Sequence, residues 1–143
     1  MTRRDLSFLL PALAFLGETL DAQAMPEHSC VFTFDSLKPA HSSGVAITRP
    51  VMRGKLPTGE TVELHETTLM PGQMPHVAHK HVHTELMLIR EGTVEFIMDG
   101  RSEQIGPGGV AYAASGEMHG LKNVGAVPAN YFVIAIGAEL QHS

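Results

Sequence analysis

The stretch Gly72–Gly92, GQMPHVAHKHVHTELMLIREG, decides how the rest of the chain is interpreted. It holds four of the nine histidines in the chain. Three histidines and one glutamate within it follow one another at a spacing of two: His79, His81, His83 and Glu85. In an extended strand, residues two apart point to the same face. An unbroken strand would therefore crowd three imidazoles and a carboxylate together, which is costly to bury unless something binds them. A divalent metal is the simplest binder of such a set.

Length and composition set broad limits. A chain of 143 residues suits one domain, and 43% hydrophobic residues are enough to form a core. A formal net charge of -5 gives no indication of nucleic-acid binding. The single cysteine, Cys30, excludes an intramolecular disulfide. It has no Cys-x-x-Cys partner and no basic neighbours to activate it, so we expect an unreactive thiol.

Residues 1–24 are predicted to be a signal peptide. Two adjacent arginines precede the apolar stretch Leu6–Gly17, which is too short to span a bilayer. Ala22–Ala24 then supplies a small-x-small cleavage pattern, with Met25 as the expected mature start. The arginine pair partly resembles a twin-arginine signal. We expect export to the periplasm or secretion, with no membrane attachment after cleavage; the alternative is an amphipathic helix that stays attached.

The rest of the chain is predicted to be all-β. Within a mixed N-terminal extension at 25–44, Val31–Phe34 is a candidate edge strand. From position 45, short apolar or alternating runs are separated by turns rich in glycine and proline, and Asp99-Gly100 is a tight hairpin signal. The expected strands are 45–56, 61–70, 84–90, 93–98, 101–105, 110–113, 119–124 and 131–136. Short strands at this spacing indicate a sandwich or barrel, here one domain at 45–140.

Two spacings in this region resemble the two sequence motifs of the cupin superfamily. The first is Gly72-x6-His79-x-His81-x3-Glu85-x6-Gly92. The second is Gly108-x5-Ala114-x-Gly116-x2-His119-x3-Asn123, in which Ala114 replaces the motif's proline and Gly109 its usual acidic residue. The motifs stand in the family's order, separated by a hairpin. The resemblance implies a double-stranded β-helix, the jelly-roll barrel of cupins.

The resemblance also implies a metal in the mouth of the barrel. The family's ligands carry over onto four residues: His79, His81, Glu85 and His119. Three imidazoles and one carboxylate suit divalent Fe, Mn, Ni, Zn or Cu, with open positions for water or substrate. The alternative is a degenerate site that no longer holds metal.

Other polar residues have plainer interpretations. We expect His83 to face outward or to lie behind the ligands, which requires a local kink or twist. His65 and His76 are expected at the surface or in packing contacts. Asn123 is expected to satisfy backbone groups in a turn, and Arg90 to be solvated.

Three functions remain open for such a metal-binding cupin. The first is a metal-dependent enzyme, a dioxygenase or isomerase acting on a small molecule such as an acid or phenol. The second is a non-catalytic protein that binds a small molecule or sugar, and the third a metal-binding or sensing protein. The sequence has no His-Glu-x-x-His, Walker or Gly-x-Ser-x-Gly pattern. It also has no helix-turn-helix segment, so no nucleic-acid partner is expected.

The alternation of residues further predicts a homodimer. If Glu85 faces the interior, Met87 and Ile89 share its face. Leu86 and Leu88 then point outward and need cover. The N-terminal segment of the same chain is one possible cover, and a second subunit related by twofold symmetry is the one we expect.

Overall fold

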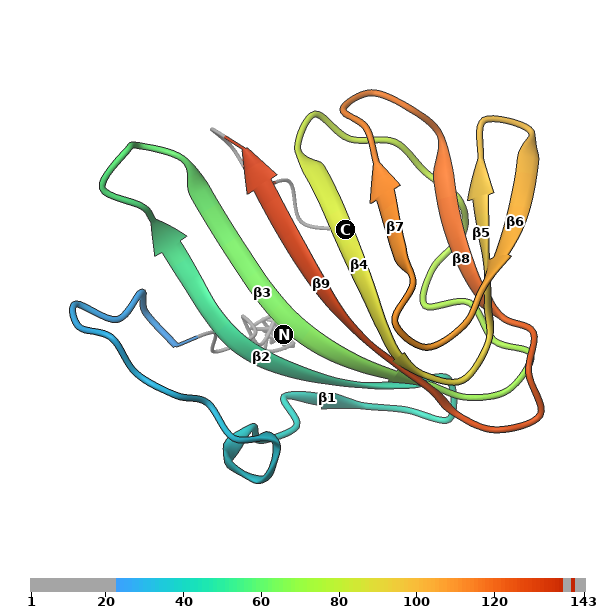
Figure 1. The fold of residues 1–143 in the computed structure, drawn as a ribbon, viewed down its shortest axis with the longest axis horizontal. Coiled ribbons are helices and arrows are strands. Elements are labelled where there is room, and N and C mark those ends of the chain that lie inside the picture. The colour runs from blue at the N-terminus through green and yellow to red at the C-terminus, as the bar shows by residue number, and fades with distance from the viewer. Residues whose placement is uncertain (1–22, 138–139, 141–143) are drawn as a thin grey trace, which may run out of the picture.

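The computed structural model describes residues 23–137 and 140. The predicted signal peptide lies outside the described residues, apart from its last two positions. None of the described residues belongs to a helix long and apolar enough to cross a bilayer. The described part of the chain contains one short 3-10 helix and nine strands (Figure 1). They are η1 (Phe34–Ser36), β1 (His41–Ser42), β2 (Ala46–Lys55), β3 (Thr61–Leu69), β4 (Thr84–Glu91), β5 (Val94–Met98), β6 (Arg101–Ile105), β7 (Val110–Ala113), β8 (His119–Asn123) and β9 (Ala129–Gly137).

The strands form two antiparallel sheets. The larger sheet has the order β1-β2-β3-β9-β4-β7, and the smaller one has the order β6-β5-β8. Figure 1 shows the two sheets side by side, joined by loops that pass between them at both ends. The predicted jelly-roll barrel is therefore confirmed, and eight of the strands match the expected ranges closely. The expected hairpin is also present, since Asp99 and Gly100 both have positive φ, at 41° and 87°.

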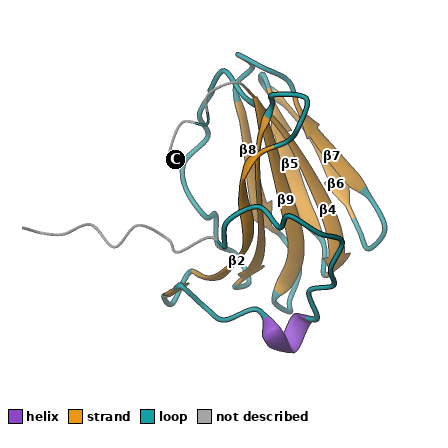
Figure 2. Cartoon of the chain, turned by 90° about the vertical axis from the view of Figure 1, so that its left-hand side faces the viewer, coloured by secondary structure: helices purple, strands orange, loops and turns teal. Residues whose placement is uncertain are grey.

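The expected edge strand at Val31–Phe34 is wrong. Residues 31–33 have no regular structure, and the chain turns into η1, which lies at the lower end of the strands (Figure 2). Ser36 donates through both its backbone amide and its hydroxyl to the carbonyl of Thr33. Such local hydrogen bonds compete with strand pairing. The edge of the larger sheet is instead formed by β1.

The N-terminal segment is fastened to the larger sheet by an aromatic ring. The guanidinium groups of Arg49 and Arg90 lie 5.0 and 4.7 Å from the centre of the Phe34 ring. Arg49 also forms an ion pair of 2.8 Å with the fully buried Glu66. Arg90 is exposed, as expected, and its guanidinium also contacts the Phe34 ring.

The core occupies one end of the space between the sheets. Its largest members come from both sheets, among them Leu69, Ile89, Val94, Phe96 and Tyr131. Tyr131 pairs with Thr67 on one side and with Ile89 on the other, so these residues define the inner face of the larger sheet.

Toward the other end of the barrel, polar residues of β3 face inward and apolar residues face outward, the reverse of the usual arrangement. His65 and Glu63 follow Thr67 at a spacing of two along β3, so they share its inner face. The apolar residues Val62 and Leu64 alternate with them and therefore face outward. The inner face of β3 is consequently polar in this part of the barrel, while Val62 and Leu64 lie on its outer face.

The outer face of β4 agrees with the predicted alternation. Met87 and Ile89 are buried inside, whereas Leu88 is 39% exposed. On the adjacent strand β7, Val110 pairs with Leu88 and Tyr112 with Leu86, and both β7 residues are more than half exposed. The described N-terminal segment leaves these side chains uncovered.

Asn123 closes the turn that joins β8 to β9. Its side chain is fully buried and donates to the carbonyls of Leu69 and Val127, both at 2.9 Å. Its side-chain oxygen accepts a hydrogen bond of 2.9 Å from the amide of Gly125. The expected backbone-satisfying role is therefore confirmed, and the contact with Leu69 ties the smaller sheet to β3.

Replacing Asn123 with alanine leaves two carbonyls and one amide without these partners. We expect the free energy of unfolding to fall by about 3 kcal/mol, because unsatisfied buried polar groups are costly. Urea denaturation monitored by circular dichroism measures the change. Lys122→Ala, at a half-exposed neighbouring position, is the control and should change stability by less than about 0.5 kcal/mol. Similar losses in both variants would contradict the role of Asn123.

Candidate metal centre

The backbone brings the two histidine-bearing segments together before any side chain is considered. His79 and His119 form an isolated antiparallel bridge, with amide-to-carbonyl distances of 2.9 and 2.8 Å. The carbonyl of His81 accepts a further hydrogen bond of 2.8 Å from the amide of Gly116. Gly120 allows the close approach, since a Cβ there would lie only 3.2 Å from that of Ala78. The loop before β4 is thus held against β8.

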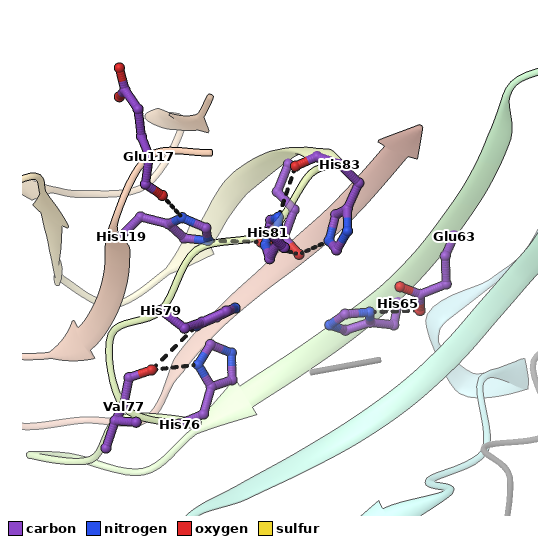
Figure 3. Close-up of polar contacts among 10 residues, drawn as sticks. Glu63, His65, His76, Val77, His79, His81, His83, Glu117 and His119 are labelled. Atoms are coloured by element: carbon purple, nitrogen blue, oxygen red, sulfur yellow. Dashed lines mark hydrogen bonds and ion pairs between the residues drawn. The ribbon is translucent and has the colours of Figure 1, made fainter. Parts of the chain in front are cut away.

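The four predicted ligands converge in the interior of the barrel, and Figure 3 labels the three histidines among them. The ring centres of His79, His81 and His119 lie 4.7–5.1 Å from one another. Glu85 joins them from β4, with one carboxylate oxygen 3.3 Å from Nε2 of His81 and the other 3.5 Å from Nε2 of His119. One ligand atom from each of the three histidines can be chosen so that all lie within 4.8 Å of one another. A single ion can bridge such distances.

Hydrogen bonds to backbone carbonyls fix the tautomer of each of these histidines. The pairs joining Nδ1 to a carbonyl oxygen are His79 with Val77 at 3.3 Å, His81 with His83 at 2.8 Å, and His119 with Glu117 at 3.0 Å. Because a carbonyl can only accept, Nδ1 carries the hydrogen and Nε2 of the neutral ring carries a lone pair. All three Nε2 atoms are buried without a hydrogen-bond partner. This donor set fits a divalent metal, since ligating histidines typically donate their other ring N–H in this way.

Electrostatics favour the charge states that metal binding needs. Burial alone would raise the pKa of the Glu85 carboxyl, but the imidazoles of His119, His83 and His81 outweigh burial and hold that pKa at about 2. Burial lowers the pKa of His79 and of His81. The carboxylate of Glu85 raises the pKa of His119. Glu85 is therefore an anion and His79 and His81 are neutral around neutral pH.

His83 does not face outward, which corrects one of its two expected positions. A bend at residues 82–83 precedes β4, as the expected kink requires, but the side chain is only 3% exposed. Its ring stacks on His81 at 3.5 Å, and its Nε2 lies 3.0 Å from an oxygen of Glu85. Because the carboxylate accepts, Nε2 carries the hydrogen, and His83 orients Glu85 from behind the cluster.

Two further histidines lie near the site, in surface or packing positions as expected: His76 is exposed and His65 is partly exposed. His76 lies edge-on against His79 with ring centres 4.2 Å apart, and it shares the carbonyl of Val77 as a hydrogen-bond partner (Figure 3). His65 lies on the inner face of β3, with Nδ1 2.8 Å from a carboxylate oxygen of Glu63. The alternation of polar and apolar residues along β3 was the available signal, but it does not say which side faces the interior.

Known proteins share parts of this sequence. A family model described as the cupin domain matches residues 65–135. The L-ectoine synthases of Bordetella parapertussis and Bordetella bronchiseptica are each 38% identical over 56 residues. That match covers 38% of this chain and 42% of each synthase, so it spans less than half the length of these relatives.

Solved structures share the fold. A protein described as a predicted oxalate decarboxylase from Thermotoga maritima superposes with a TM-score of 0.64 at 21% identity, covering 76% of this chain and 99% of that one. The polyketide cyclase RemF from Streptomyces resistomycificus gives 0.62 at 18%, covering 78% and 81%. An RmlC-like cupin from Shewanella frigidimarina gives 0.62 at 16%, covering 78% and 94%. The family match, the two histidine motifs and the jelly-roll barrel together show that the chain belongs to the cupin superfamily.

Proposed function

We propose that this protein is a metal-dependent enzyme in which His79, His81, Glu85 and His119 hold one divalent transition metal and a small molecule reacts beside it. The observation that carries the proposal is the set of three buried Nε2 atoms, each left without a hydrogen by a hydrogen bond at Nδ1 and none of them hydrogen-bonded, with the oxygens of Glu85 3.3 and 3.5 Å from two of them. Buried polar atoms without partners are costly, and a bound ion offsets that cost. The metal is one of Fe, Mn, Ni, Zn or Cu.

The chemistry we favour is of isomerase or lyase type, without O2. A bound divalent metal supplies Lewis acidity toward an oxygen of the substrate. The chain itself holds Glu85 as a carboxylate, keeps two imidazoles neutral and encloses the centre between the sheets. The names of similar proteins, a synthase, a cyclase and a predicted decarboxylase, support a reaction that makes or breaks bonds in a small molecule. Metal binding without turnover of any small molecule would instead indicate a binding or sensing protein.

The first test is the metal content of the mature protein, purified without an affinity tag. We expect about one transition metal per chain by plasma mass spectrometry. His79→Ala and His119→Ala should each lose most of it, because each removes one of the bare Nε2 donors. His41→Ala, at an exposed position on β1, is the control and should keep the full content. Full retention in both site variants would contradict the ligand assignment.

The second test is the pH dependence of metal binding. Protons compete with the metal for Nε2, so binding weakens as pH falls. His119 has the raised pKa and takes up a proton first, whereas the lowered pKa values of His79 and His81 keep these rings neutral to lower pH. We expect the retained metal to fall progressively below about pH 6.5, the ordinary histidine value. Equilibrium dialysis between pH 8 and pH 5 measures it, and a constant content over this range would contradict ligation by histidine.

We also propose that a second copy of the chain covers the outer face of β4 and β7. Leu88, Val110 and Tyr112 are 39%, 56% and 58% exposed there. β7 is the last strand of the larger sheet, so its outer edge is unpaired within the sheet. An apolar patch at a sheet edge is a hazard for a lone subunit, and a twofold contact between identical patches removes it.

Light scattering at tens of micromolar tests this assembly. We expect the mass of two subunits for the mature protein and of one subunit for the double variant Leu86→Asp, Leu88→Asp, since the change places two charges in the apolar contact. Val127→Asp, at an exposed position in the turn before β9, is the control and should stay dimeric. A single-subunit mass for the unmodified protein, or a dimer that survives the double variant, would contradict the proposed face.

A further inference from the structure

A carboxylate–histidine pair faces the barrel interior, separate from the four proposed ligands. His65 and Glu63 lie on the inner face of β3, joined by a contact of 2.8 Å between Nδ1 and Oε1. Their side chains are 24% and 21% exposed, and that of Glu85 is 16% exposed. Solvent therefore reaches both the pair and the candidate centre.

The strand register places Glu63 in the same row as Glu85, and His65 in the next inward-facing row, which continues through Val133 to Met87. Ala135 on β9 pairs with Glu63 on one side and with Glu85 on the other. The backbones of Glu63 and Glu85 are thus two strands apart, about 9.6 Å at the usual spacing. Only the methyl group of Ala135 stands between them along this row. Figure 3 shows the His65 ring projecting from β3 on the side of the histidine cluster, with Glu63 beyond it.

The hydrogen bond fixes the tautomer of His65. The carboxylate of Glu63 accepts, so Nδ1 carries the hydrogen and Nε2 of the neutral ring carries a lone pair. This is the relation between base and orienting carboxylate used in proton-transfer enzymes.

We propose that His65 is the catalytic base and acid of this cupin and that Glu63 is its positioning residue. The proposal rests on the function proposed above and narrows the substrate to a small carbonyl compound with an acidic C–H beside the carbonyl. That C–H bond breaks, its proton passes to Nε2 of His65, and its electron pair forms the C=C bond of an enolate as the carbonyl π pair moves to oxygen. Return of the proton to the substrate restores the neutral ring, so no oxidant or reductant is needed.

Proton exchange with a simple probe tests the base. The probe is pyruvate in D2O, and proton NMR follows the replacement of its methyl protons by deuterium. We expect the metal-containing protein to exceed the buffer rate, and His65→Gln to lose at least tenfold of that acceleration. Glu63→Gln should lose less, because the imidazole remains. His41→Gln is the control and should behave like the unmodified protein. Equal exchange by His65→Gln, or no acceleration by the metal-containing protein, overturns the proposal.

Chemical labelling gives a second readout that does not depend on turnover. At pH 8, diethyl pyrocarbonate modifies neutral imidazole nitrogens, and peptide mass spectrometry follows each histidine separately. We expect the labelling rate of His65 to fall at least threefold in Glu63→Gln, while that of His41 stays unchanged. An unchanged rate at His65, or no labelling there, overturns the pair. Metal content is measured on every sample: a chain without metal contradicts the proposed function itself, whereas full metal with these failures contradicts the pair alone.

Discussion

The backbone pairing of His79 with His119 is the constraint on which the candidate centre depends. His119 belongs to the smaller sheet, and Glu85 belongs to the larger one. The two hydrogen bonds between His79 and His119 fix the loop that carries the other histidines against the smaller sheet. Side chains from both sheets can then meet at one point. The barrel therefore positions the site mainly through main-chain contacts, and the side chains are left free to present Nε2.

A second constraint comes from the carbonyls around the cluster. Each of the three imidazoles donates Nδ1–H to a nearby main-chain oxygen within two residues of its own position. The local geometry of the backbone therefore sets the orientation of the three rings. His83 adds a further hydrogen bond from behind Glu85. Metal affinity of such a site depends on this surrounding layer as well as on the ligands themselves.

Much of this arrangement could be predicted from the sequence. Alternation and turn residues predicted eight strands. That His119 joins His79 was implied only by the resemblance to the cupin motifs, because no local pattern or spacing relates two such distant residues. The structure differs from the predicted edge strand at Val31–Phe34. There, local hydrogen bonds outweigh the strand propensity of the residues, and the chain enters a 3-10 helix at Phe34. At His83 the expected kink is present, because β4 begins only at Thr84, and the side chain takes the second of its two expected positions, behind the ligands.

His65 could not be placed for a different reason. Polar and apolar residues alternate over the first five residues of β3, and the ordinary expectation for a half-buried strand is that its apolar side faces the core. Here Val62 and Leu64 face outward and the polar side lines the barrel, which is the reverse. Only the pairing of Thr67 with the buried Tyr131 identifies the inner face. That information is tertiary and is absent from the strand's own sequence.

The alanine that lies between the two polar groups has a consequence for selectivity. Ala135 is flanked in register by Glu63 and Glu85, and its side chain is the smallest that still has a Cβ. A larger side chain at this position would limit the size of the molecule that fits across the barrel, without altering a metal ligand or a hydrogen bond. Its neighbours in sequence, Ile134 and Ile136, point to the opposite side of the sheet. Substitutions at position 135 can therefore change the size of the interior, while substitutions at 134 and 136 change the outer surface, each without affecting the other.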